Sequence, residues 1–114
     1  MKRYVAVKET GKQIGIFHML DLLEQAEMTA DDYGNLDWAE YKLNLELVVP
    51  EYKPGVTTEA WFTDKGAQHF EEAISILGGL VNKYLNEYHF LELSVDVINN
   101  AIMYSDEYQV VYRR

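Results

Sequence analysis

The chain has no cysteine and only two prolines among its 114 residues. Without cysteine it can form no disulfide, no thiolate nucleophile and no cysteine-ligated zinc or iron–sulfur site. No apolar run approaches the roughly 20 residues that a membrane-spanning helix needs. The N-terminal residues alternate apolar with polar side chains and lack the continuous apolar segment of a signal peptide. We therefore expect a cytoplasmic protein with no membrane partner.

Positive charge is also scarce: 10 Lys and Arg stand against 19 Asp and Glu, so the formal net charge is −9. Nonspecific nucleic-acid affinity depends on basic side chains that neutralise phosphates, so direct nucleic-acid binding is not expected. No Lys or Arg occurs between Lys12 and Lys42, an interval that contains the carboxylates of Asp21, Glu24, Glu27, Asp31, Asp32, Asp37 and Glu40. Such an acidic surface either only keeps the protein soluble or attracts a basic partner.

Motifs that mark catalytic or cofactor sites are missing as well. The serines lie outside a G-x-S-x-G elbow, and the glycines match neither the Rossmann fingerprint nor the P-loop. An EF-hand register that starts at Asp31 or Asp32 fails, because the required glycine is replaced by Leu36 or Asp37. No HExxH or HxH pairing occurs among the histidines, which are His18, His69 and His89. We expect no catalytic residue, no metal and no cofactor.

Hydrophobic periodicity predicts one α+β domain over the whole chain, residues 1–114. A hairpin is expected over residues 3–17, followed by a short amphipathic helix over 18–27. A longer helix is expected to begin after Thr63, its N-cap, and to continue to Glu87.

The remaining segments alternate in the manner of strands. A strand is predicted over 41–49, a turn over 50–55 and another strand over 56–62, followed by three strands, the last two joined around residues 105–107. In the first of these strands one face is expected to carry Tyr41, Leu43, Leu45, Leu47 and Val49. The expected order, ββαββαβββ, gives a mainly antiparallel sheet with two helices packed on one face.

The segment TADDYGNLDWAEY, residues 29–41, is predicted to be an acidic connector, because Gly34 and Asn35 suit a turn. If the acidic surface binds a partner, Tyr33 and Trp38 of this segment would be its anchors. The presence of Trp38 is explained equally well if its side chain inserts into the core beside the next strand. The candidate partner-binding residues are Asp31, Asp32, Tyr33, Asp37, Trp38 and Glu40.

Small size, absence of cysteine, strong acidity and the lack of a catalytic constellation together resemble small phage-encoded inhibitors, such as anti-CRISPR and DNA-mimic anti-restriction proteins. The carboxylates from Asp21 to Glu40 carry this resemblance. It implies a non-enzymatic, stoichiometric inhibitor that binds a basic or nucleic-acid-binding surface of a partner protein, for example a nuclease.

The alternative is a structural or assembly subunit that oligomerises through a sheet edge or a helix face. Gly78-Gly79, inside the longer predicted helix, bears on this alternative. Two glycines are unfavourable in a helix interior, so they favour close packing of the helix on a sheet or a kink, with a ligand or partner contact as the other explanation.

Overall fold

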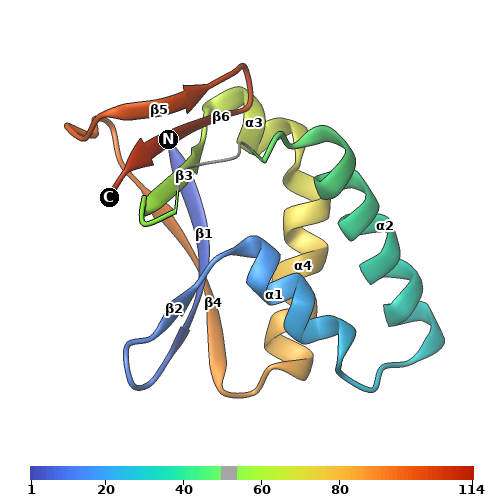
Figure 1. The fold of residues 1–114 in the computed structure, drawn as a ribbon. Helices are drawn as coiled ribbons and strands as arrows, with labels where there is room; N and C mark the ends of the chain where they lie inside the picture. The colour runs from blue at the N-terminus through green and yellow to red at the C-terminus, as the bar shows by residue number, and fades with distance from the viewer. Residues whose placement is uncertain (50–53) are drawn as a thin grey trace.

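The computed structural model describes residues 1–49 and 54–114, which form an α+β domain with helices on one side of an antiparallel sheet (Figure 1). In chain order the elements of this part of the protein are β1 (Lys2–Lys8), β2 (Gln13–Ile14), α1 (Ile16–Glu24), α2 (Ala30–Glu46), β3 (Thr58–Phe62), α3 (Asp64–His69), α4 (Glu71–Tyr84), β4 (Tyr88–Ser94), β5 (Ile102–Ser105) and β6 (Gln109–Arg113). The predicted fold class is confirmed, whereas the predicted order of elements is not.

Strand β1 is the centre of the sheet, whose order is β2-β1-β3-β6-β5 with β4 on the other edge of β1. Along β4 the pairing is continuous, from Lys2 opposite Ser94 to Lys8 opposite Tyr88. On the opposite edge, β3 pairs with β1 only at Lys2, and β2 pairs with it at Ala6 and Val7. Between these two contacts, over residues 3–5, no described strand pairs with this edge of β1. We call this interval the seam.

The core lies between the sheet and the helices. Its largest fully buried side chains come from α1, α2, α4 and the residue between α3 and α4: Met19, Leu20, Leu23, Leu36, Leu43, Phe70 and Leu77. Gly78 of α4 packs directly on β4, because a Cβ at this position would lie 2.8 Å from Cδ1 of Phe90. The expected close packing of the helix on the sheet is confirmed for Gly78, whereas Gly79 faces open space.

Helix α2 replaces both the predicted connector over 29–41 and the predicted strand over 41–49. Thr29 caps the helix, since its hydroxyl oxygen accepts a hydrogen bond from the backbone N–H of Asp32 at 3.2 Å. Leu36, Ala39 and Leu43 are all buried, and their spacing of three and four residues is helical. The strand prediction was wrong because these contacts with the core outweigh the local alternation that follows Tyr41.

The longer predicted helix is divided in two at Phe70. The N-cap prediction is confirmed, since the hydroxyl of Thr63 accepts from the backbone N–H of Gly66 at 3.0 Å. At Phe70 the backbone leaves helical geometry, with φ −99° and ψ 9°, and the side chain becomes fully buried. Because the helix is interrupted at Phe70, α3 contacts β3 while α4 contacts β4. Helix α4 ends at Tyr84, short of the predicted end.

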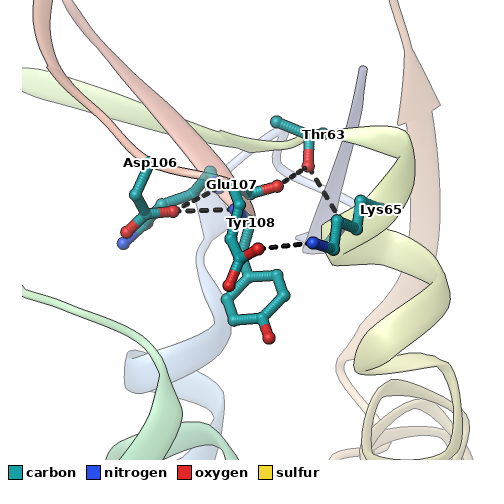
Figure 2. A network of polar contacts seen from close by, with 7 residues as sticks. Thr63, Lys65, Asp106, Glu107 and Tyr108 are labelled. Atoms are coloured by element: carbon teal, nitrogen blue, oxygen red, sulfur yellow. Dashed lines mark hydrogen bonds and ion pairs between the residues drawn. The ribbon is translucent and has the colours of Figure 1, made fainter.

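The predicted C-terminal hairpin is confirmed as β5 and β6, and Figure 2 shows how it is held against α3. The carboxylate of Asp106 accepts from the backbone N–H of Tyr108 at 2.8 Å and so closes the turn. Thr63 donates its hydroxyl to the carbonyl of Glu107 at 2.7 Å. Gly66 lies against the hairpin backbone, where a Cβ would come within 1.9 Å of the Tyr108 oxygen. Only glycine fits this position without a shift of the hairpin.

The predicted N-terminal hairpin and the strand over 56–62 are also present, as β1–β2 and β3. Strand β3 pairs with β1 and β6, because its expected partner is a helix. Most of the predicted turn over 50–55 lies outside the described residues. At its end Gly55 has a φ of 85°, a value that favours glycine.

Candidate functional site

Helix α2 is the outermost helix of the domain, and α4 lies between it and the sheet (Figure 1). One face of α2 is therefore packed and the other meets solvent. Residues spaced seven apart lie on one line along a helix, so Asp31, Trp38 and Leu45 are aligned, with Gly34 and Tyr41 in the adjacent line. The surface formed by these residues and the neighbouring Asp37 is the α2 outer face. It comprises Asp31, Gly34, Asp37, Trp38, Tyr41 and Leu45.

The α2 outer face exposes large apolar side chains. Trp38 is 41% exposed, and Tyr41 and Leu45 are each 65% exposed. The exposure of Trp38 excludes the alternative that it fills the core. Exposed apolar side chains that adjoin one another on one surface mark binding sites more often than isolated ones do. Tryptophan and tyrosine are also the residues most enriched at energetic centres of interfaces.

The carboxylates of this face have no ion-pair partner among the described residues. Asp31 and Asp37 are exposed, and no ion pair within residues 1–49 and 54–114 involves either of them. The nearest basic residue on the helix, Lys42, is 3.0 Å from the carboxylate of Glu46, which offsets its charge. The outer face therefore presents negative charge beside its apolar side chains.

Asp32, another predicted partner-binding residue, holds α2 to α4. Its carboxylate accepts a hydrogen bond from Lys83 at 2.7 Å and another from the hydroxyl of Tyr84. These two hydrogen bonds, with Lys83 the larger cause, hold the pKa of Asp32 below its usual value. Since its oxygens are used inside the protein, Asp32 is a structural carboxylate that lies off the outer face.

Tyr33 and Glu40 face the α1 side of the helix. The hydroxyl of Tyr33 donates to the carbonyl of Ala26 at 2.8 Å and so fixes the connection between α1 and α2. A hydrogen bond with Glu24, together with partial burial and nearby carboxylates, raises the pKa of Glu40 to about 7. Of the six predicted partner-binding residues, the structure thus brings together Asp31, Asp37 and Trp38 on one surface.

Sequence reasoning missed Tyr41 and Leu45, which it assigned to the buried face of a strand. That assignment was wrong, because on a helix both side chains point away from the packed residues Leu36 and Leu43. The helical spacing from Trp38 to Tyr41 and Leu45 was the signal that could have identified them.

Within residues 1–49 and 54–114, no group of three or more His, Asp or Glu side chains is arranged to hold a metal ion. None of the helices in the same part of the chain is long and apolar enough to span a bilayer. Comparison with protein-family models, curated proteins and solved structures finds no match to this chain. A functional assignment therefore depends on the surfaces and cavities described from the structure.

Proposed function

We propose that this protein is a non-enzymatic, stoichiometric binder that acts in the cytoplasm and docks the α2 outer face on a basic surface of a partner protein. The observation that supports this best is the adjacency of Trp38, Tyr41 and Leu45, all exposed, beside carboxylates that form no ion pair within the described part of the chain. The apolar side chains would supply affinity by burial, and the carboxylates would select and steer a positively charged partner.

Charge indicates the kind of partner. A second copy of this chain would bring Asp31 and Asp37 close to like charges, and each copy carries a net charge of −9. A partner rich in Lys and Arg has the complementary charge. Nucleic-acid-binding surfaces, such as that of a nuclease, have this character, so the proposal includes an inhibitor of the kind that small acidic phage proteins represent.

Charge reversal on the outer face tests the proposal. The variant Asp31→Lys/Asp37→Lys should lose capture of a basic protein from cells that carry CRISPR and restriction nucleases. Asp32 is left unchanged, because its replacement would disturb the contact with α4. The matched control is Glu9→Lys/Asp96→Lys, which makes the same change of charge at exposed positions without ion pairs among the described residues.

The control should capture the partner as the wild type does. Capture by the wild type and by the control should weaken as salt rises from about 0.05 to 0.5 M, because screening shortens the range of the attraction. Circular dichroism should be the same for all three proteins. Equal capture by the Asp31→Lys/Asp37→Lys variant would refute the assignment of this face.

The second candidate function is an assembly subunit that pairs through a sheet edge. Strand β5 ends one path of the sheet, and its residues Ile102 and Met103 are 61% and 40% exposed. Gly78 is covered by Phe90, so the helix-face version of this idea has less support. Light scattering separates the two functions. An oligomer that persists at high salt and is lost in Ile102→Lys favours assembly, and a monomer favours the α2 outer face.

A further inference from the structure

A cavity of about 210 Å³ lies at the seam of the sheet, where β1 has no described strand beside it. Its walls come from β1, β3, the first turn of α1, Leu47 and Gln109, and they are mainly apolar. At roughly 30 Å³ per water molecule, this volume corresponds to about seven waters. We call this cavity the seam pocket. It has no residue in common with the α2 outer face.

Two buried donors without hydrogen-bond partners belong to residues that line the seam pocket. They are Nε1 of Trp61, whose residue is 6% exposed, and Nε of Arg3. No other buried side-chain nitrogen or oxygen in the described part of the chain lacks a partner. Arg3 Nε is 3.3 Å from a carboxylate oxygen of Glu59, an ion pair whose geometry is not that of a hydrogen bond. Buried donors are rarely left unsatisfied, so Trp61 Nε1 suggests a missing acceptor, whereas Arg3 Nε has the charge of Glu59 beside it.

The N-terminus of α1 contributes further donors to the same cavity. Gly15, the N-cap, has no side chain to accept a hydrogen bond, and the first turn contains no acidic residue. Met19 donates its backbone N–H to the carbonyl of Gly15 at 3.0 Å, which is the first intrahelical bond. The N–H groups of the three preceding residues, Ile16 to His18, therefore have no acceptor within the helix, and these residues line the pocket.

The charge around the pocket is locally positive, in contrast to the rest of the protein. Arg3 also donates to the carbonyl of Ala60 at 3.1 Å, which holds its guanidinium in the seam. Burial lowers the pKa of Arg3, Glu59 opposes this effect, and the nearby charge of Arg114 lowers the pKa further. Among the described residues that line the pocket, none is acidic, and Arg3 carries a positive charge. The positive end of the α1 dipole adds to this charge.

We propose that the seam pocket binds a small organic carboxylate with an apolar body. The carboxylate would accept hydrogen bonds from the first turn of α1 and from Arg3, and from Trp61 Nε1–H after a shift of the indole, because this nitrogen is not exposed to the cavity in the free protein. The apolar body would pack on the aromatic and aliphatic wall that includes Phe17 and Leu47. One arginine in the lining and mainly apolar walls suit a monoanion better than phosphate, which carries more charge and no apolar surface.

The experiment titrates 3-phenylpropionate into the ¹⁵N-labelled protein. The chain has two tryptophans, so two indole N–H signals are expected, and Trp38→Phe assigns them. Binding should shift the Trp61 indole signal and the backbone signals of Ile16 to His18, while the Trp38 indole signal stays in place. The neutral amide 3-phenylpropionamide and the small anion acetate should each bind at least tenfold more weakly.

The proposal is overturned if 3-phenylpropionate leaves the Trp61 indole signal unchanged. It is also overturned if the amide binds as tightly as the acid, which would remove the role of charge, or if acetate does so, which would remove the role of the apolar wall.

Substitution of the N-cap gives a second, independent test. Gly15 has φ −89° and ψ −177°, an extended conformation that any residue adopts, and a Cβ there meets nothing within 4 Å. In Gly15→Asp the new carboxylate would occupy the N-terminus of α1, so affinity for 3-phenylpropionate should fall at least tenfold in a folded protein. Gly15→Ala adds a methyl group without the charge and should lose much less affinity than Gly15→Asp. Unchanged binding by a folded Gly15→Asp variant contradicts the proposed site. The variant Arg3→Met tests the site separately and should weaken binding of 3-phenylpropionate at least tenfold.

Discussion

The α2 outer face and the seam pocket both contain groups that the fold itself does not use, but the two regions differ in charge and in burial. The outer face presents Trp38 and its neighbours to water beside exposed carboxylates. The seam pocket encloses Trp61 and uncapped N–H groups beside Arg3. The same type of side chain, tryptophan, is thus exposed beside negative charge in one region and buried beside positive charge in the other.

The difference shows at which region a bound ligand should stabilise the folded protein more. Water solvates the carboxylates of the outer face, so the free protein loses little stability when no partner is bound. A buried donor without an acceptor costs about 1–3 kcal/mol. A ligand that satisfies Trp61 Nε1 should therefore stabilise the folded protein noticeably, whereas a partner at the outer face should mainly form an additional interface.

The largest expected effect distinguishes the two faces of α2. Leu43→Ala removes a fully buried side chain from the packed face, and we expect a loss of about 3 kcal/mol in the free energy of unfolding. Leu45→Ala truncates a 65% exposed side chain on the outer face and should change this free energy by less than about 0.5 kcal/mol. Urea denaturation of both variants provides the measurement.

The pair of variants is its own control, because the same substitution is made two residues apart on one helix. If residues 41–49 formed the alternating strand that the sequence suggested, Leu43 and Leu45 would share a face and lose similar stability. Equal losses would therefore contradict the orientation of α2 and, with it, the outer face.

The misassignment of α2 has a physical explanation. From Tyr41 to Leu47 apolar and polar residues alternate, which fits a strand, while Leu36, Leu43 and Leu47 are also spaced in the manner of a helix. Packing of α2 on α4 decides between these patterns, and a local pattern does not contain that contact. The strongly local features were predictable, as the Thr63 cap and the C-terminal hairpin show.

The seam pocket could not be predicted from the sequence. Arg3 and Trp61 are far apart in the chain, and their proximity depends on the short contact of β1 with β3 opposite Lys2. Neither residue belongs to a motif. The outer face was partly predictable, because Asp31, Asp37 and Trp38 are close together in the sequence, but its other aromatic residue, Tyr41, required the helix.

An effect of intermediate size concerns the pH dependence of stability at Glu40, which the structure places on the α1 side of α2. Its pKa of about 7 in the folded protein lies above the ordinary value of 4.5, so the folded state binds this proton more strongly than the unfolded state. The resulting stability is present below about pH 4.5 and is lost as the pH rises through 7. Glu40→Gln should remove this dependence and raise the free energy of unfolding at pH 8 by about 1 kcal/mol, allowing for solvent screening.

Thermal unfolding between pH 4 and 9 measures this effect, and Glu27→Gln, at an exposed position, makes the same change of charge for comparison. Capture of the basic partner should be the same for Glu40→Gln and the wild type, since Glu40 faces α1. A loss of capture would extend the binding surface toward α1 and revise the boundary of the outer face.

The smallest effect concerns stability at the seam pocket. Gly15→Asp supplies the cap that α1 lacks and places a carboxylate at the positive end of its dipole, so the free energy of unfolding should rise by about 0.5 kcal/mol. Thr29→Ala removes the cap of α2 and should have the opposite sign, a loss of about 1 kcal/mol. Addition of 3-phenylpropionate should raise the melting temperature of the wild type and of Thr29→Ala, but not of Gly15→Asp. If Gly15→Asp gains stability and still responds to the ligand, the carboxylate does not bind at the α1 terminus.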